Sequence, residues 1–431
     1  MKKVLIITYY WPPVGGAGVQ RWLKFSKYFR EFGWEPIIYT PSNPDFPIFD
    51  ETLLKDVPKD LTVLKTEITE PYDLYRKIMR KKKTETVNQG FLSEGKENSF
   101  LQSLMIWVRG NFFIPDARKF WIKPSISYLS DYISKNKIDA IISTGPPHSM
   151  HLIALGLKQK FNLPWIADFR DPWTGIDFYS QLKLSKWADK KHHELEYKVL
   201  NTADKVVTVS PSCAFDLCLL GKKPVEVVTN GYDTDDFNLS NLKVEGGFIF
   251  HHTGALNKDR NPQTLWRVLS DLCKENQDLK NDLRLKFTGK TDAIVFDSLK
   301  QLGLESNTIK VAYMPHSEIV RSMCESPILL LPLNNTPNNK GVLSGKLFEY
   351  LAANRPIFGI GLPDGDAARI LEETQAGTMC GFEDYEGIKK VVLDLYHKYK
   401  LKQLHIKGGS IDKYSRKSCA KAYTNFLNSI I

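Results

Sequence analysis

Short apolar runs alternate along the chain with longer segments whose apolar residues recur at helical spacing. The run at 4–8, for example, leads through a loop into an amphipathic segment at 19–32. Continuous apolar runs of this length are typical of strands buried on both faces. The alternation therefore predicts an α/β protein with βαβ units in doubly wound parallel sheets. The predicted strands are 4–8, 34–40, 138–144, 203–210, 248–254, 285–289, 309–314, 328–333 and 356–361.

The turn after the first predicted strand is rich in glycine, with Gly15, Gly16 and Gly18. A dinucleotide fingerprint would have a third glycine where Arg21 stands, and an acid after the second strand, where 41–43 reads Pro-Ser-Asn. The pattern therefore disfavours a nicotinamide cofactor. Glycines at this turn instead let a phosphate or an acceptor approach the backbone, or they form a tight turn without a ligand.

Histidines and charged residues follow two predicted strands in the first half of the chain. Because the carboxyl ends of parallel strands meet at one edge of a sheet, we expect these side chains to form a site. Any one of them alone would be a capped loop residue. They are His148, His151, Asp168, Arg170 and Asp171.

The segment 340–356 follows the predicted strand 328–333 and contains a predicted helix at 346–353. Its glycine-containing turn presents free backbone N–H groups at a helix N-terminus, which suits a phosphate. Lys346 adds positive charge there, and Glu349 shares its helical face, where a carboxylate can accept hydrogen bonds from the two hydroxyls of a ribose. This combination predicts a nucleotide diphosphate ligand. The alternative is a solvated surface pair.

Basic residues cluster between 76 and 83, and a segment rich in large apolar and aromatic residues follows at 100–114. Basic charge beside exposed aromatic residues is how peripheral proteins bind an anionic bilayer. The region 76–114 is therefore a candidate membrane surface. A solvated helix followed by a core helix explains the same pattern, and no nucleic-acid recognition motif accompanies it.

Length and composition set the broad class of the protein. The 431 residues exceed one ordinary core, which predicts two domains of roughly 200 residues each. The net charge of +10 favours an anionic partner. The first residues resemble the start of a signal peptide, but the apolar run is short and meets Trp11 without a cleavage pattern. With scattered cysteines and no run of roughly 18 apolar residues, we predict a cytoplasmic location, free or peripheral on the inner face of the plasma membrane.

Four motifs, in this order and spacing, resemble the retaining glycosyltransferases of family 4. They are Pro-Pro-Val-Gly-Gly at 12–16, Asn-Gly-Tyr-Asp-Thr-Asp-Asp-Phe at 230–237, the segment 254–260, and Gly-Lys-Leu-Phe-Glu-Tyr-Leu-Ala at 345–352. The segment Ala-Asp-Phe-Arg-Asp-Pro-Trp at 167–173 resembles a segment found in a subgroup common in bacterial cell-surface polysaccharide synthesis. The resemblance covers nearly the whole chain. It implies the GT-B fold, in which two Rossmann-like doubly wound parallel-sheet domains face a central cleft.

This resemblance also implies a division of the chain. Residues 1–237 would form an acceptor domain, with a C-terminal helix at 415–431 packing back on it. A linker at 238–247 would lead to a sugar-nucleotide-binding domain at 248–414.

The resemblance assigns roles to residues. Glu349 would hold the ribose, while Lys346 and Arg260 would neutralise the diphosphate. Because fixed cations and a helix N-terminus can replace a metal at the leaving group, we expect no metal ligands and no cofactor. The donor-binding candidates are Gly254, Lys258, Arg260, Gly345, Lys346, Leu347 and Glu349; the catalytic candidates are His148 and Asp171; and the phosphate or acceptor loop contains Gly15, Gly16 and Gly18.

The leading prediction is a hexosyltransferase-type glycosyltransferase (EC 2.4) of surface polysaccharide biosynthesis, retaining and metal-independent. It would move a sugar from a UDP- or GDP-type nucleotide sugar to a glycan or lipid-linked acceptor. Gly341 stands where the family often has the first of two glutamates, which leaves recognition of the sugar open. The alternatives are a sugar-nucleotide epimerase of the same fold and a membrane-associated scaffold with a decayed donor pocket. Two Asp-x-Asp triplets, at 233–235 and 364–366, would instead indicate a metal-dependent transferase of another fold.

Overall fold

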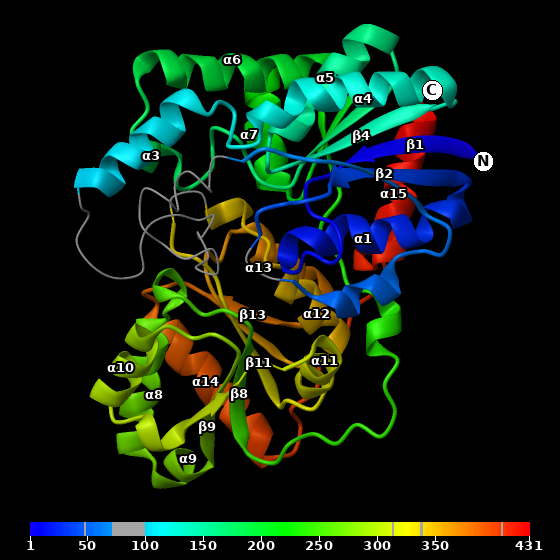
Figure 1. Ribbon diagram of the computed structural model, residues 1–431. Helices are drawn as coiled ribbons and strands as arrows, with labels where there is room; N and C mark the ends of the chain where they lie inside the picture. The colour runs from blue at the N-terminus through cyan, green and yellow to red at the C-terminus, as the bar shows by residue number, and fades with distance from the viewer. Residues whose placement is uncertain (47–48, 71–99, 313, 337–338, 407) are drawn as a thin grey trace. The chain divides into compact units, whose positions relative to one another are not determined.

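A computed structural model describes residues 1–46, 49–70, 100–312, 314–336, 339–406 and 408–431 (Figure 1). The described residues form two compact units. The first unit contains Met1–Thr229 and Cys419–Ile431, and the second contains Asn230–Ser418. The chain therefore passes from one unit to the other twice. Residues 230–247, which the sequence analysis divided between the first domain and a linker, fall in the second unit.

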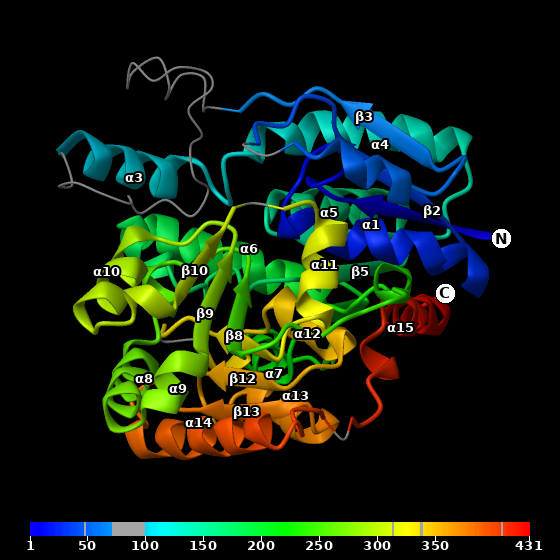
Figure 2. The same ribbon diagram turned by 90° about the horizontal axis from the view of Figure 1, so that it is seen from below.

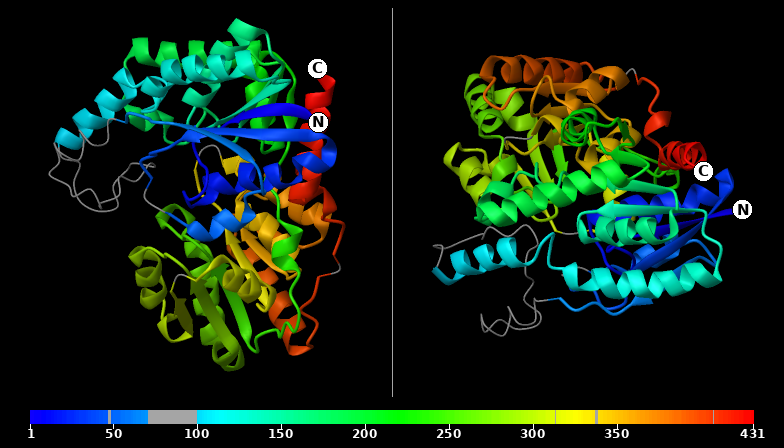
Figure 3. Two further views of the ribbon diagram at one scale, coloured as in Figure 1. Left: turned by 45° about the vertical axis from the view of Figure 1, so that its right-hand side comes forward. Right: turned by 90° about the horizontal axis from the view of Figure 1, so that it is seen from above.

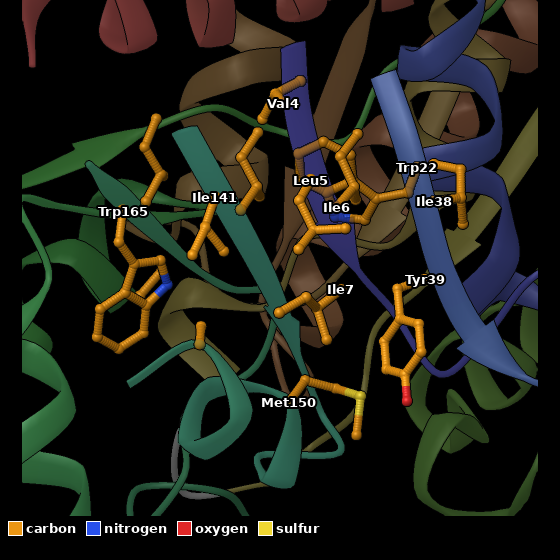
Figure 4. Close-up of a cluster of buried hydrophobic side chains, with 14 of the residues drawn as sticks. Val4, Leu5, Ile6, Ile7, Trp22, Ile38, Tyr39, Ile141, Met150 and Trp165 are labelled. Carbon is orange, nitrogen blue, oxygen red and sulfur yellow. The ribbon is translucent and has the colours of Figure 1, made fainter. Parts of the chain in front are cut away.

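The first unit is built on a seven-stranded parallel sheet with the order β3-β2-β1-β4-β5-β6-β7. Val4 in its central strand pairs with Pro36 on one side and Ala140 on the other. The apolar runs of the sequence form the buried middle of this sheet, and Figure 4 shows their side chains. The strands are β1 (Lys2–Ile7), β2 (Trp34–Pro41), β3 (Thr62–Thr66), β4 (Ala140–Gly145), β5 (Trp165–Phe169), β6 (Lys205–Thr208) and β7 (Val225–Val227).

Helices cover both faces of this sheet. Figure 1 shows α4, α5 and α6 on one face and α1 on the other, and Figure 3 shows α15 beside α1. The rings of Trp22 in α1 and Tyr423 in α15 are 5.1 Å apart, so the last helix completes the core of the first unit. The helices are α1 (Ala17–Phe29), α3 (Phe100–Phe112), α4 (Ile122–Lys135), α5 (Ser149–Phe161), α6 (Lys186–Thr202), α7 (Pro211–Gly221) and α15 (Arg416–Ser429).

The second unit is built on a six-stranded parallel sheet with the order β10-β9-β8-β11-β12-β13. Along β11, Leu330 packs into one core, while Leu329 and Leu331 pack into the core on the opposite face. This alternation is the period of two expected for a strand with both faces buried. The strands are β8 (Phe248–Thr253), β9 (Leu283–Thr288), β10 (Thr308–Val311), β11 (Ile328–Pro332), β12 (Ile357–Ile360) and β13 (Gly377–Cys380).

The helices of the second unit also form two layers (Figure 2). Side chains from α8 and α14 share one core, and those from α11, α12 and α13 share the other. The helices are α8 (Gln263–Glu275), α9 (Gln277–Asp282), α10 (Ala293–Gln301), α11 (His316–Cys324), α12 (Gly345–Ala353), α13 (Asp366–Thr374) and α14 (Tyr385–Lys400). Short 3₁₀ helices include η5 (Thr234–Phe237), η6 (Lys258–Arg260) and η8 (Asn339–Gly341).

Both sheets reverse their strand order at the centre, between β1 and β4 and between β8 and β11. We call these positions the first and second switch points. Open α/β sheets bind ligands outside the carboxyl ends of the strands at such a point, because neighbouring loops diverge there. The prediction of two doubly wound parallel sheets is confirmed. No helix among the described residues is long and apolar enough to cross a membrane.

Candidate functional site

The second switch point brings Gly254, after β8, against Lys346 in the first turn of α12. Gly254 has a φ of 83°, which favours glycine, and a Cβ at this position would lie 2.8 Å from Cε of Lys346. Any larger residue at 254 would therefore displace the lysine. The Lys346 side chain consequently lies directly over the loop that follows β8.

Arg260 links the two loops of this switch point. Its Nε donates a 2.5 Å hydrogen bond to Oδ1 of Asn334, in the loop after β11. The backbone N–H of Asn335 in turn donates to the carbonyl oxygen of Asp259 at 3.0 Å. Both bonds hold the Arg260 guanidinium at the carboxyl edge of the sheet. The sequence analysis did not identify Asn334, because an asparagine in a polar loop carries no distinguishing pattern.

Lys346 and Arg260 are half-buried cations that repel each other. Burial and the charge of Arg260 together lower the pKa of Lys346 to about 8, and Glu349 opposes the change. Burial also lowers the pKa of Arg260, and Asp259 opposes that change. Among the described residues, no carboxylate lies within 4.0 Å of either cation. Two half-buried positive charges in mutual repulsion favour an anion that binds both.

The helix α12 adds backbone donors to this cationic site. Ser344 is its N-cap, and its hydroxyl accepts a 3.4 Å hydrogen bond from the backbone N–H of Lys346. The hydroxyl of Tyr350 accepts a 3.0 Å bond from the backbone N–H of Thr253, which fixes the helix to the end of β8. Gly345 is exposed at the helix start, so the positive end of the helix dipole is open to a ligand.

Two of the predicted donor-binding residues differ from the half-buried cations in burial. Leu347 is fully buried in the core of the second unit, so its side chain supports α12 from behind. Lys258 is exposed, and its backbone N–H donates a 3.1 Å bond to Oδ2 of Asp292.

Glu349 lies one turn along α12 from Lys346, in a mixed electrostatic environment. Burial raises the pKa of its carboxyl, while His316, Arg416 and Lys346 lower it. Nε2 of His316 is 3.3 Å from Oδ2 of Asp236. The sequence analysis missed His316, Arg416 and Asp236, since they come from separate elements and share no spacing with Glu349. The carboxylate of Glu349 is thus half-buried, and basic neighbours favour its charged form.

Gly341, at the position of the expected first glutamate, is buried in η8. The neighbouring Lys340 forms a 2.7 Å ion pair with Asp364, and Asp366 lies 3.3 Å from Arg369. The second Asp-x-Asp triplet is therefore engaged by basic side chains. Among the described residues, no group of three or more histidine, cysteine, aspartate or glutamate side chains is arranged to hold a metal ion.

The first switch point is held together by Arg170, just after β5. Its Nη1 donates a 2.8 Å bond to the carbonyl oxygen of Gly18, and its Nη2 donates to that of Pro146. The loops after β1, β4 and β5 thus meet at one guanidinium. Gly16 has a φ of 88°, and a Cβ on Gly18 would lie 2.9 Å from the ring of Tyr10. Gly15 is buried in the same turn.

His148 lies at the same switch point, at the start of α5, and only 7% of it is exposed. Its ring stacks on Trp173 with centroids 4.8 Å apart and planes 6° apart. Burial lowers the pKa of His148 well below its ordinary value, and His151 and Arg170 lower it further. His148 is therefore a neutral imidazole. Asp171, the second catalytic candidate, is exposed.

Asp168 does not belong to this site, contrary to the expectation for polar groups at strand ends. It is fully buried and forms an ion pair with Arg21, with Oδ1 and Nη2 3.0 Å apart. Hydrogen bonds from Tyr423 at 2.6 Å and from Thr144 and Trp22 at 2.8 Å fill the rest of its carboxylate. Although burial opposes ionisation, the Arg21 charge holds the pKa of Asp168 below its ordinary value. The carboxylate is structural.

The comparisons with known proteins agree with this architecture. Residues 91–236, about a third of the chain, match the model of Glycosyltransferase Family 4. The structure is similar to sucrose-phosphate synthase from Thermosynechococcus elongatus, with a TM-score of 0.64, 13% identity, and coverage of 100% of this chain and 99% of that one. The chain has the GT-B fold. The resemblance to family 4 glycosyltransferases is confirmed.

Other GT-B neighbours were solved with ligands. A variant of S. aureus TarM, in complex with fondaparinux, α-GlcNAc-glycerol and UDP, has a TM-score of 0.61 and 12% identity, with 99% and 100% of the two chains covered. Anabaena HepE in complex with UDP-glucose has a TM-score of 0.57 and 11% identity, with 100% of this chain and 97% of that chain covered. No curated protein matches the sequence at a significant level.

Proposed function

We propose that the protein is a retaining, metal-independent hexosyltransferase that moves a sugar from a UDP- or GDP-type nucleotide sugar to a glycan or lipid-linked acceptor of a surface polysaccharide. The observation that carries this proposal is the pair of half-buried cations at the second switch point, Lys346 and Arg260, neither of which has a carboxylate within 4.0 Å in the part of the chain that the structure describes. A diphosphate supplies the negative charge that both lack. Two of the structural neighbours were solved with UDP or UDP-glucose.

The chemistry of transfer explains why fixed cations suit this site. When the bond between the sugar's anomeric carbon and the diphosphate oxygen breaks, the electron pair stays with the leaving diphosphate. Lys346, Arg260 and the N-terminus of α12 stabilise that developing charge without reorganising. Glu349, one turn further along, holds the ribose hydroxyls and so fixes the nucleoside. In the first unit, the neutral imidazole of His148 and the Gly15–Gly18 turn serve the uncharged sugar and acceptor.

Calorimetric titration of the full chain with UDP, GDP and ADP, and then with their sugars, tests the donor site. We expect one nucleoside diphosphate to bind, and Lys346→Ala to weaken it about 10- to 100-fold through loss of a charge-assisted contact. Lys274→Ala, which removes an exposed lysine from the outer face of α8, is the matched control and keeps the affinity. Absence of binding by every nucleotide would overturn the donor assignment and favour the scaffold alternative.

An epimerase of the same fold is distinguished by its products. The neighbours include a putative UDP-N-acetylglucosamine 2-epimerase from Listeria monocytogenes, with a TM-score of 0.56, 11% identity, and 100% and 96% of the two chains covered. An epimerase converts the bound nucleotide sugar without an acceptor. A transferase releases nucleoside diphosphate, slowly to water and faster with acceptor. Chromatography that quantifies both the nucleotide sugar and the nucleoside diphosphate, for a panel of sugar nucleotides, distinguishes the two activities.

We further propose that α3 carries the part of the membrane surface that the structure describes; the basic residues at 76–83 lie outside the described residues. Leu104, Trp107 and Phe112 are exposed on this helix, and the rings of Trp107 and Phe112 are 5.7 Å apart. Lys183 donates to Ser103 at 3.0 Å, which places a cation on the same helix as these rings. Aromatic side chains next to basic ones match an anionic bilayer.

Flotation with phosphatidylglycerol vesicles tests this surface. Trp107→Ser with Phe112→Ser should abolish binding, whereas Phe215→Ser with Leu219→Ser, which alters an exposed apolar pair on α7, should keep it. Equal losses in both double variants, or no binding by the original chain, would contradict the assignment.

A further inference from the structure

The ring of His148 is held by a side chain that the proposed reaction does not otherwise use. Trp173, in the loop after β5, is 3% exposed, and its ring stacks on the imidazole. The other ring contacts are looser, since the ring centroids of His151 and Phe169 lie 5.7 and 5.9 Å from that of His148. The indole therefore restrains the plane of the His148 ring, together with a hydrogen bond between the ring and the backbone of Pro172.

Trp173 is itself fixed at two points by α6. Its indole Nε1–H donates a 3.0 Å hydrogen bond to Nδ1 of His192. Its backbone N–H donates to Oε1 of Glu196 at 3.3 Å, and the hydroxyl of Thr174 donates to Oε2 of the same carboxylate. His192 and Glu196 are four residues apart and so share one face of the helix. One bond orients the indole and the other holds its backbone.

The hydrogen bond from Trp173 also defines the state of His192. An indole N–H is only a donor, so Nδ1 of His192 must be an acceptor and the imidazole must be neutral. Burial lowers the pKa of His192 below its ordinary value, in agreement with this state. Protonation of His192 would convert its acceptor into a donor and break the bond. The hydrogen bond between Trp173 and His192 therefore requires a neutral His192.

We propose that Trp173, braced by His192 and Glu196, is a positioning residue that fixes the ring plane of His148 and excludes water from it. This inference rests on the proposed function, in which His148 faces the transferred sugar. Without the indole, rotation about the second side-chain torsion of His148 is less restricted, because that torsion is intrinsically broad and mainly the bond to the Pro172 backbone then opposes it. A misplacement of about 1 Å in a group that orients substrate costs up to about 100-fold in rate.

The groups that face His148 predict how its titration depends on Trp173. They are Arg170 after β5, His151 on α5 and His192 on α6, and each disfavours a proton on His148. Desolvation is the largest cause of the low pKa. Replacing the indole by a methyl group admits water, so the pKa of His148 rises toward the ordinary value of about 6.5.

Two variants of Trp173 test the proposal in the full chain. Trp173→Ala should lower kcat about 10- to 100-fold while leaving the nucleotide affinity unchanged, and it should raise the pKa of His148 measured by NMR. Trp173→Phe keeps an aromatic stack and should recover most of kcat and the low pKa. Trp187→Ala, an exposed tryptophan on α6, is the control and should match the original chain in both readouts.

His148→Gln assigns the NMR signal. If Trp173→Ala fails to fold, His192→Leu takes its place, since it removes only the acceptor of the indole bond and should give the same two changes to a smaller extent. An unchanged His148 pKa in these variants, or an equal loss of kcat in Trp173→Phe and Trp173→Ala, overturns the positioning role. The NMR measurement needs no turnover, so an unchanged His148 pKa contradicts the positioning role alone. Absence of nucleotide binding contradicts the proposed function.

Discussion

In the core of the first unit, the buried charges of Asp168 and Arg21 neutralise each other, whereas at the second switch point neither Lys346 nor Arg260 has a carboxylate within 4.0 Å among the described residues. Asp168 has Arg21 at 3.0 Å, with three further donors on its oxygens. Nη1 and Nη2 of Arg170 donate to backbone carbonyls, while its buried Nε has no hydrogen-bond partner among the described residues. Lys346 and Arg260 instead repel each other electrostatically, and burial lowers the pKa of each.

The difference shows what each switch point is built to bind. A buried charge needs a partner, because its loss of hydration is otherwise uncompensated. The first unit supplies that partner for Asp168 from α1 and places buried, neutral imidazoles after β4, which favours an uncharged ligand at that switch point. The described residues of the second unit place no carboxylate within 4.0 Å of Lys346 or Arg260, which favours an anionic ligand there. We therefore expect two sheets with the same reversal of strand order to bind ligands of different charge.

The largest contrast is expected in stability. Asp168→Asn leaves the Arg21 charge buried without its ion pair, so the free energy of unfolding should fall by about 3–5 kcal/mol. Lys346→Met removes a half-buried charge that has no carboxylate within 4.0 Å among the described residues, so stability should stay the same or rise. Urea unfolding at neutral pH measures both, with Asp271→Asn as an exposed control. Equal destabilisation by Asp168→Asn and Lys346→Met would remove the distinction between the two switch points.

A smaller effect is expected for nucleotide binding, in which Glu349 and the two cations should have separate roles. If its carboxylate binds the ribose, the original chain should prefer UDP or GDP to the 2′-deoxy form about 10-fold, as for one charge-assisted hydrogen bond. Glu349→Gln should lose most of that preference. Lys346→Met should lower the affinity for both nucleotides and keep the preference for the ribose form. Calorimetry with the two nucleotides forms a double-mutant cycle. A preference that survives Glu349→Gln would show that the ribose lies elsewhere.

The fold could be predicted because buried parallel strands produce continuous apolar runs, such as 4–7 and 328–332, that carry their own signal. The Lys346 and Glu349 pair was visible for a similar reason, since both residues lie on one helix next to a glycine turn. In both cases the interacting positions are close in sequence.

The roles of Arg21 and Asp168 could not be predicted, because their network joins residues as distant as Thr144 and Tyr423. A strand-end aspartate has the same sequence pattern whether it is catalytic or buried in an ion pair. Asn334, His316 and Arg416 likewise depend on tertiary contacts between separate loops. Long-range polar partners are thus the part of both switch points that sequence patterns leave undetermined.

The smallest expected effect is a pH dependence confined to the second switch point. Lys346 in the free protein has a pKa of about 8, lowered from the ordinary lysine value, and only its protonated form attracts a diphosphate. Affinity for the nucleotide sugar should therefore be highest at and below about pH 7. It should fall as the pH rises through about 8, because Lys346 must then take up a proton on binding. Lys346→Arg keeps its charge throughout this range and should bind with little pH dependence. Calorimetry in two buffers of different ionisation enthalpy counts the proton directly, and uptake that persists in Lys346→Arg would assign the dependence to another group.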